Sequence, residues 1–249
     1  MSIYKKVLII SDNVYLSTLV KDSFLKYRSE SLSIRFSVSP FSDQSIFSKQ
    51  LDEIVEVYDL RDPKTVQFLI TTYDLIISIH CKQIFPPYLI NNIKCINVHP
   101  GYNPINRGWY PQVFAIDKNI QVGATIHEID EKLDHGNIID REFIEIEMTD
   151  NSETLYNKII QKEIELLNKN LDNILKNNYS IIIPENEGNL YLKKDFKALC
   201  ELKLDEKLTT MQFVNRIRAL THGDFKNAFF IDPVSKKKVF ITIQLTPEN

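Results

Sequence analysis

Cysteine is scarce in this chain of 249 residues, which contains only three. Cys81, Cys95 and Cys200 are far apart in the sequence, and no CxxC spacing occurs. Such usage argues against a disulfide framework and favours reduced thiols, as found in the cytoplasm. We therefore expect a cytoplasmic protein.

Long hydrophobic runs are also missing. Runs such as residues 7–10 and 75–77 are far shorter than the roughly 20 apolar residues that a membrane-spanning helix needs. The N-terminus has no extended apolar core of the kind that a signal peptide carries. We expect no membrane partner.

The chain has no excess of positive charge, with 30 basic and 33 acidic residues and a net charge of −3. A chain of this balance has no general attraction for phosphate backbones. Its densest basic run, Lys236 to Lys238, lies in a predicted hairpin turn and is interpreted as a solvated tip. We expect no nucleic-acid partner.

Motifs that cradle phosphates or bind metals are absent too. Neither GxGxxG nor GxxxxGK occurs, so a dinucleotide fold with a phosphate cradle is unsupported. Neither HxH nor HExxH occurs, so the geometry of any zinc site would have to come entirely from the fold. We expect no metal, and a metal-dependent hydrolase stays as an alternative that would use His99, His127, Asp134 and His135.

Short β-type segments alternate with partly helical ones over the first hundred residues. A helix is predicted over residues 14–27, and strands are predicted over residues 5–10, 32–38, 54–58, 75–79 and 95–98. Hydrophobic residues make up 43% of the chain, which is enough for a sizeable core. The alternation predicts an α/β fold, a mainly parallel sheet with helices on both faces.

The second half of the chain is expected to end this domain and begin another. Strands are predicted over residues 123–129, 137–146 and 179–184, and residues 149–153 indicate the start of a long amphipathic helix. A turn or linker at residues 185–189 then separates a domain at 1–185 from a small α+β appendage at 186–249. The appendage has a capping box at Thr209 to Gln212 and β-rich runs at 228–231 and 239–243.

The most informative residues are Asn97 and His99, two positions apart at the predicted end of a strand, followed by Asp134 in a later loop. Residues two apart on a strand point to the same side. A His that takes a proton, an Asn that donates to an oxyanion and an Asp that balances charge suit acyl transfer to an amine. A lone His after a strand is more often structural, but the Asn before it and the Asp after it reverse that expectation.

The order of these residues and their surroundings resemble the 10-formyltetrahydrofolate-dependent formyltransferases. The segment from Asn106 to Gln112 looks most like the branch that N-formylates nucleotide-linked amino sugars. The resemblance implies a Rossmann-like formyltransferase domain, in which Asn97 steadies the formyl oxygen, His99 accepts the amine proton and Asp134 orients the imidazole. His135 stands where family members often have a small residue, and its role is open.

The same resemblance implies a folate site on two loops. One carries Gln83, Ile84, Phe85 and Pro86, and the other begins at Asp130. By itself the first loop is a plain strand-to-helix connection, although ligands of open α/β sheets bind at the carboxyl ends of the strands. The co-substrate implied is 10-formyltetrahydrofolate.

A nucleotide-linked substrate needs an aromatic face for its base and cations for its pyrophosphate. Phe229 and Phe230 in the appendage are interpreted as core or dimer-interface residues, with a homodimer expected. The candidates for nucleotide binding are Arg107, Trp109, Tyr110, Tyr191, Lys193 and Arg218.

The resemblance implies N-formylation of a nucleotide-linked amino sugar. A dTDP-linked 4-amino-4,6-dideoxy hexose or its 3-amino isomer is the expected acceptor, for O-antigen or other surface polysaccharide synthesis. Methionyl-tRNA formylation fits less well, because that branch carries a larger basic C-terminal domain. Glycinamide ribonucleotide formylation and a non-catalytic folate or nucleotide-sugar binding protein are the further alternatives.

Overall fold

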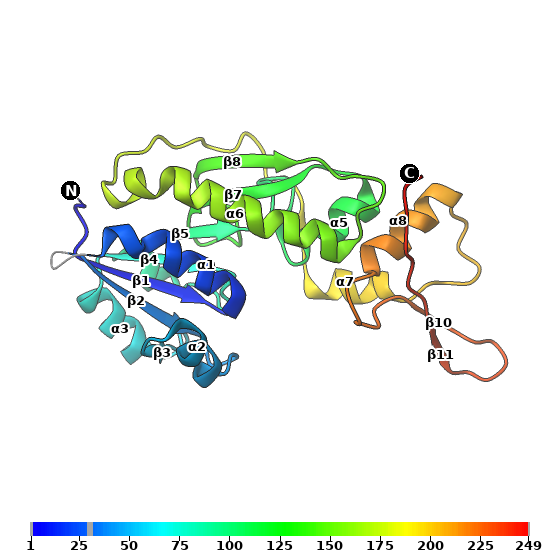
Figure 1. Ribbon diagram of the computed structural model, residues 1–249, viewed down its shortest axis with the longest axis horizontal. Coiled ribbons are helices and arrows are strands. Elements are labelled where there is room, and N and C mark those ends of the chain that lie inside the picture. The colour runs from blue at the N-terminus through cyan, green and yellow to red at the C-terminus, as the bar shows by residue number, and fades with distance from the viewer. Residues whose placement is uncertain (1, 29–31, 249) are drawn as a thin grey trace.

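The structure is a computed structural model that describes residues 2–28 and 32–248. Its centre is a seven-stranded sheet with the strand order β3-β2-β1-β4-β5-β7-β8 (Figure 1). Five strands run parallel: β1 (Lys6–Ser11), β2 (Ser33–Val38), β3 (Val55–Val57), β4 (Leu75–Ile79) and β5 (Lys94–His99). At one side of the sheet, β7 (Val122–Glu128) runs antiparallel to β5, and β8 (Ile138–Ile144) runs antiparallel to β7. The predicted α/β class and mainly parallel sheet are confirmed.

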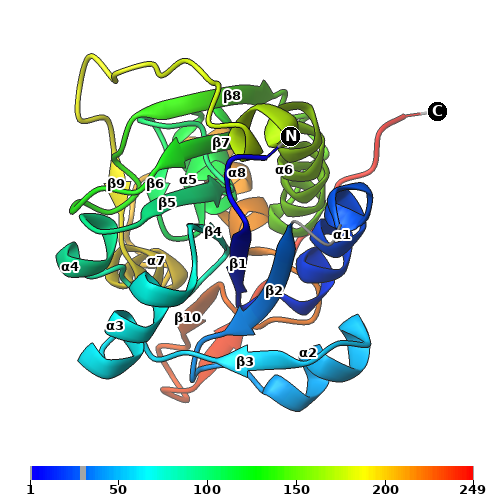
Figure 2. The ribbon, with the colours of Figure 1, turned by 90° about the vertical axis from the view of Figure 1, so that its left-hand side faces the viewer.

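Helices cover both faces of this sheet, because alternate strand residues are buried on opposite sides. Val7 and Ile9 pack under α1 (Val14–Phe24), α2 (Gln44–Leu51) and α6 (Ser152–Leu175). Leu8 and Ile10 pack under α3 (Pro63–Thr72) and α4 (Pro87–Ile90) on the other side. Figure 2 shows α1 and α6 on one side of the sheet and α3 and α4 on the other.

Side-chain caps explain where the helices begin. The side chain of Asn13 accepts from the backbone N–H of Leu16 at the start of α1, which continues into a 3₁₀ turn at Leu25–Tyr27. Asn151 and Thr154 form a capping box at the start of α6, within the predicted helix start. Thr209 and Gln212 form the predicted capping box of α8 (Thr210–Leu220).

The C-terminal segment shares a hydrophobic core with the main domain. It consists of α7 (Lys193–Cys200), α8 and the hairpin of β10 (Phe229–Ile231) and β11 (Lys238–Phe240), at one end of the molecule (Figure 1). Leu220 and Ala228 pack with Phe114 of α5 (Pro111–Lys118) and with Leu155 and Ile159 of α6. The predicted α+β character of the appendage is confirmed.

The predicted strand over residues 179–184 is wrong. Its only ladder contact is the pairing of Ile182 with Ile138, at one end of the edge strand β8. The segment otherwise leaves the sheet with Ile181, Ile182 and Ile183 exposed, so its apolar run does not mark a buried strand.

A short parallel pair, β6 (Arg107–Gly108) and β9 (Leu190–Tyr191), was not predicted. Strands of two residues are too short to leave a periodic pattern in the sequence. This pair holds the segment that follows the predicted linker against the loop that follows β5. Gly188, at φ +60°, approaches the Pro104 oxygen so closely that a Cβ there would lie 1.9 Å from it.

Candidate active site

Asn97, His99 and Asp134 meet at the carboxyl end of β5. Asn97 and His99 belong to the strand, and Asp134 lies in the loop between β7 and β8. Asn97 Nδ2 donates to Asp134 Oδ1 at 3.1 Å, and His99 Nδ1 lies 3.6 Å from Asp134 Oδ2. The structure therefore brings together the three side chains that the sequence predicts to be catalytic.

Asp134 is held in place by its neighbours on every side. Its backbone is in the left-handed region, at φ 47°, and its main-chain oxygen accepts from Asn103 Nδ2 at 2.9 Å. Its Oδ2 accepts from the Gly108 N–H at 3.0 Å. Burial by itself raises the pKa of Asp134, but His99, His127 and the Gly108 N–H outweigh burial and lower that pKa to about 2. The carboxylate is therefore charged at neutral pH.

His99 presents Nδ1, not Nε2, to Asp134. Its Nε2–H donates to the main-chain oxygen of Asn106 at 2.9 Å, which leaves Nδ1 as the nitrogen with a free lone pair. A Cβ at Gly101 would lie 2.4 Å from Nε2, so glycine is required for this close approach. Burial lowers the pKa of His99 more than Asp134 raises it, so the imidazole is neutral at pH 7.

These protonation states leave two acceptors facing each other. The Nδ1 lone pair of His99 and the carboxylate of Asp134 are 3.6 Å apart without a proton between them. An N–H group that approaches both atoms from one side can donate a bifurcated hydrogen bond to them. The arrangement therefore suits a base that removes a proton from an amine.

His127 is a member of the site whose role the sequence did not reveal. It is the cross-strand partner of Asn97 in the antiparallel pair of β5 and β7. Its Nδ1–H donates to the Glu128 oxygen at 2.7 Å, so its Nε2 accepts from Asn97 Nδ2 at 3.2 Å. Both amide hydrogens of Asn97 are thereby engaged, one by His127 and one by Asp134. A prediction that β5 and β7 pair with Asn97 opposite His127 could have identified His127 as part of the site.

The predicted folate loop follows β4, and its side chains have different surroundings. The Gln83 side chain forms two hydrogen bonds with the backbone of the loop after β3. Its Oε1 accepts from the Leu60 N–H, and its Nε2 donates to the Tyr58 oxygen. Phe85 is buried in the core beneath α3 and α4, and Pro86 precedes the first turn of α4. Ile84, in contrast, is 79% exposed.

Asp130, the other residue predicted at the folate, lies where the second loop begins. Its Oδ2 is 2.6 Å from Nδ1 of His135. His135 Nε2 in turn lies 3.3 Å from Glu187, which also pairs with Lys132 at 2.8 Å. His135 therefore joins the loop that carries Asp134 to the segment just before β9.

The predicted aromatic residues gather between α5, α7 and the β6–β9 pair. Tyr191 stacks on Phe114 with ring centroids 4.0 Å apart, and Tyr110 stacks on Phe196 at 4.2 Å. Both tyrosine rings are thus packed against the protein and partly buried. Lys193 Nζ, by contrast, lies 3.8 Å from the centroid of the partly exposed Trp109 ring.

The two predicted arginines are both buried, and their guanidinium groups have partners in the protein. Arg218 Nη1 donates to three main-chain oxygens in the loop before α6, those of Glu147, Met148 and Asp150. Arg107 Nη1 lies 3.5 Å from Glu187 Oε2. Neither guanidinium group is therefore exposed to solvent and available for a phosphate in this structure.

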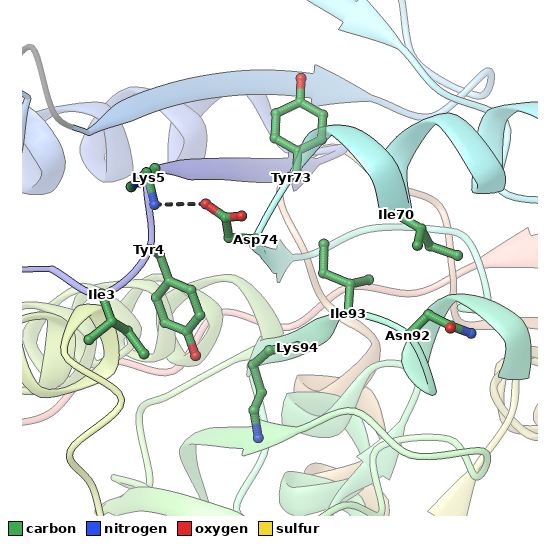
Figure 3. Close-up of a pocket in the computed structure, with 9 residues that line it drawn as sticks. All are labelled: Ile3, Tyr4, Lys5, Ile70, Tyr73, Asp74, Asn92, Ile93 and Lys94. Carbon is green, nitrogen blue, oxygen red and sulfur yellow. Dashed lines mark hydrogen bonds between the residues drawn. The ribbon is translucent and has the colours of Figure 1, made fainter.

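An open cavity of about 560 Å³ lies at the opposite end of the sheet from this site, at the amino ends of β1, β4 and β5 (Figure 3). There the Lys5 N–H donates to Asp74 at 2.7 Å, beside Tyr73 and Lys94. None of the residues predicted to be functional lines this cavity.

The described residues contain neither a metal-binding cluster nor a membrane-spanning helix. Over residues 2–28 and 32–248, no group of three or more His, Cys, Asp or Glu side chains is placed to hold a metal ion. In the same residues, no helix has the length and apolar character needed to cross a membrane.

Models of two protein families match the chain. Residues 49–171 match a family described as formyl transferase. Residues 195–247 match a family described as the N-formyltransferase dimerization C-terminal domain. The second match begins within α7 and covers most of the appendage.

Individual relatives match nearly the whole chain. A dTDP-4-amino-4,6-dideoxyglucose formyltransferase of Mycobacterium tuberculosis is 41% identical over 243 residues, 98% of this chain and 97% of that protein. The crystal structure of a 4-N formyltransferase from Francisella tularensis is 38% identical, with a TM-score of 0.90 over 98% of this chain and 99% of that one.

A more distant structure has the same fold. An N-formyltransferase of Helicobacter canadensis, in complex with folinic acid and dTDP-3-aminofucose, is 20% identical with a TM-score of 0.68. The match covers 86% of this chain and 80% of that one.

Proposed function

This chain belongs to the formyl transferase family, and from that membership we propose that it formylates the 4-amino group of dTDP-4-amino-4,6-dideoxyglucose, with 10-formyltetrahydrofolate as the donor. The observation that carries the proposal is the 41% identity with the Mycobacterium tuberculosis enzyme over 98% of this chain. The site agrees with it, because a neutral imidazole beside a charged carboxylate suits proton removal from an amine. A 3-amino isomer is the alternative acceptor.

His99 and Asp134 act together on the attacking amine. In the proposed reaction an amine N–H points at both His99 Nδ1 and Asp134 Oδ2, which are 3.6 Å apart. As the nitrogen bonds to the formyl carbon and becomes positive, His99 Nδ1 takes its proton. The carboxylate then stabilises the imidazolium, because opposite charges at this distance attract strongly in a buried site. The tetrahedral intermediate collapses as the bond between the formyl carbon and N10 of the folate breaks, and the imidazolium returns the proton to N10, which releases tetrahydrofolate.

Asn97 supplies a hydrogen bond to the formyl oxygen as that oxygen gains negative charge. A well-placed donor of this kind is worth about 3 to 4 kcal/mol of the barrier. Since both amide hydrogens are engaged in the protein, one must turn from His127 or Asp134 to the substrate. His127 is the neutral partner and so the weaker competitor, and we assign the exchange to that hydrogen bond.

The loops beside the triad suit a folate. Ile84 offers an exposed apolar side chain in the loop that follows β4, next to β5, where a flat ring can pack against it. Gln83 fixes the course of that loop through the backbone of Tyr58 and Leu60. We assign Ile84 and the backbone of residues 83–86 to the pterin, with Asp130 at the other wall.

We assign the nucleotide to the surface around Trp109 and Lys193. A partly exposed indole next to a lysine ammonium can offer an aromatic face to a base and a cation to a pyrophosphate. Tyr110 and Tyr191 support this surface by stacking on Phe196 and Phe114. Arg218 instead supports the loop before α6. Arg107 would reach a phosphate only after it separates from Glu187.

Two further features complete the proposal. The appendage matches a dimerization domain, and we propose that the protein is a homodimer assembled through it. The formylated sugar nucleotide would serve as a donor for O-antigen or another surface polysaccharide.

Incubation of the purified protein with 10-formyltetrahydrofolate and the 4-amino sugar nucleotide tests the proposal. We expect the mass of the sugar nucleotide to rise by one formyl group. The dTDP-linked 3-amino isomer is the matched comparison, and methionyl-tRNA and glycinamide ribonucleotide are the other acceptors. Formylation of either of these two, with both amino sugars unchanged, would refute the assignment.

A further inference from the structure

The segment that leads from α6 to β9, residues 176–189, passes outside the edge strand β8 (Figure 2). It is fixed to the sheet by the pairing of Ile182 with Ile138, and to the loop after β5 by the Asn189 N–H, which donates to the Pro104 oxygen at 3.0 Å. Over the described residues, every hydrogen bond or ion pair that joins residues 183–188 to another part of the chain is made by Glu187.

Three nitrogen-bearing side chains converge on the Glu187 carboxylate. Its Oε1 lies 2.8 Å from Lys132 Nζ and 3.3 Å from His135 Nε2, and its Oε2 lies 3.5 Å from Arg107 Nη1. Lys132 and His135 belong to the loop that carries Asp134, whereas Arg107 begins β6. The hydrogen bond from Lys132 lowers the pKa of Glu187, and His135 and Arg107 act in the same direction. The two loops that frame the catalytic site thus hold an oxyanion between them.

The Glu187 carboxylate is nevertheless held weakly. Its side chain is 61% exposed, and that of Lys132 is 60% exposed. Ion pairs at such exposure contribute little to stability, because water and salt screen them and the long side chains lose freedom. A phosphate group has more negative charge and more acceptor oxygens than a carboxylate, so it can displace Glu187 from these side chains.

Arg107 is only partly satisfied by this carboxylate. Its side chain is 7% exposed, yet its Nε has no hydrogen-bond partner among the described residues. Two more buried atoms of the same loop, Asn103 Oδ1 and Asn106 Nδ2, also lack a partner there. Buried polar groups are nearly always hydrogen-bonded, so three unpaired atoms in one loop point to a ligand beside it. A buried guanidinium is the group that best matches a phosphate.

This cluster joins the catalytic centre to the proposed nucleotide surface. Gly108, the residue after Arg107, donates its N–H to Asp134 Oδ2 at 3.0 Å. Trp109 follows, with Lys193 Nζ 3.8 Å from its ring centroid. In a nucleotide-linked amino sugar the pyrophosphate lies between the base and the sugar that carries the amine. The order from Trp109 and Lys193 through Arg107 to Asp134 matches the order of base, pyrophosphate and amine.

We propose that Arg107, Lys132 and His135 form, beside Lys193, a subsite for the pyrophosphate of the sugar nucleotide, and that Glu187 fills this subsite in the free protein and leaves it when the substrate binds. Glu187 is thus a built-in competitor of the substrate. Its departure also releases the contact that holds residues 183–188 over the two loops. The inference rests on the proposed function for the identity of the substrate.

Binding of inorganic pyrophosphate tests the competition without any sugar. Glu187→Gln removes the competing charge, so calorimetric titration should show pyrophosphate bound about twofold to fivefold more tightly than by the parent. Glu185→Gln is the matched control, because it removes an exposed carboxylate from the same segment, and it should leave the affinity unchanged. If Glu187 only held the segment in place, its loss would weaken binding. Weaker or unchanged binding by Glu187→Gln would overturn the inference.

Variants of the cations test the other half of the subsite. Arg107→Gln should weaken pyrophosphate binding by about tenfold, and Lys132→Gln by about threefold. Lys49→Gln, at an exposed lysine of α2, is the charge control and should bind like the parent. Lys132 is exposed, so its variant keeps the test decisive even if Arg107→Gln does not fold. Equal affinities in Lys132→Gln and Lys49→Gln would exclude the subsite.

Three further ligands identify the source of the anion. In Glu187→Gln, dTDP should gain affinity as pyrophosphate does. Thymidine, which has no phosphate, and folinic acid, whose glutamate tail carries carboxylates, should not. A gain for folinic acid alone would place the folate tail at the subsite and refute the pyrophosphate assignment. If the protein forms no formylated sugar, the pyrophosphate titrations still decide whether Glu187 occupies an anion site.

Discussion

Asn97 and His127 are direct partners across the antiparallel strands β5 and β7, with 3.2 Å between Asn97 Nδ2 and His127 Nε2. Before the substrate takes over this hydrogen, the amide that would steady an oxyanion is thus oriented by an imidazole from a neighbouring strand. His127 itself is aimed by its Nδ1–H, which donates to the Glu128 oxygen. The orientation of Asn97 therefore depends on a residue thirty positions away in the sequence.

Replacing His127 with Phe should lower kcat by about tenfold to a hundredfold with KM little changed. Without its acceptor the Asn97 amide loses one of the two contacts that orient it before the formyl oxygen takes over that hydrogen, and small displacements in a catalytic site have effects of this size. The control is His127→Gln, whose side-chain oxygen can still accept. Steady-state kinetics on both variants is the measurement, and equal losses in the two would argue against the orienting role.

His99→Asn should fold normally and lower turnover by about two to four orders of magnitude, the usual effect of losing a general base. The amide can still donate to the Asn106 oxygen, so the loop after β5 keeps its support. Circular dichroism and folate binding verify the fold, and a turnover assay gives the rate. Turnover within a factor of about two of the parent would remove His99 from the mechanism.

Asp134 should contribute stability that depends on pH. Its pKa is lowered from 3.8 to about 2 in the folded protein, so the contribution is complete above pH 3.8 and is lost as the pH falls to about 2. Unfolding free energies by denaturant titration should fall between these values by about 2 kcal/mol more in the parent than in Asp134→Asn. Parallel pH dependences in the two proteins would show that Asp134 has no such shift.

Lys193→Ala should raise KM for the sugar nucleotide by about fivefold to tenfold, with KM for the folate unchanged. The Lys193 ammonium lies over the Trp109 ring, and the substitution removes its proposed contact with the pyrophosphate. Lys194→Ala is the matched control, because Lys194 is the exposed next residue of the same helix. Similar KM values in both variants would place the nucleotide elsewhere.

Phe240→Asp should convert the proposed homodimer to a monomer. Phe240 is 43% exposed in β11, and the neighbouring Val239 and Ile231 are also partly exposed, within the segment that matches a dimerization domain. Burying an unpaired carboxylate in such an interface is unfavourable. Light scattering after size exclusion gives the mass. Val234→Asp, at the exposed hairpin turn, should remain dimeric, and a dimer of Phe240→Asp would exclude this surface.

Local features of the chain could be predicted from the sequence alone. The caps at Asn151 and Thr209 and the alternation of strands with helices follow from interactions between residues close in sequence. The placing of Asn97 and His99 on one side of a strand end follows from the two-residue period of β-structure. These rules carry enough information for the fold class and for two members of the site.

Tertiary structure decided everything that depends on which strands are neighbours. The pairings of Asn97 with His127 and of His80 with Glu163 join residues that the sheet order and α6 bring together. Likewise, only packing places Phe85 in the core and leaves Ile84 exposed. Only the tertiary structure shows that residues 179–184 pair with the edge strand β8 at Ile182 alone and so form no strand. Sequence periodicity records the local conformation of each segment, whereas these contacts arise from burial and hydrogen bonding between segments far apart in the chain.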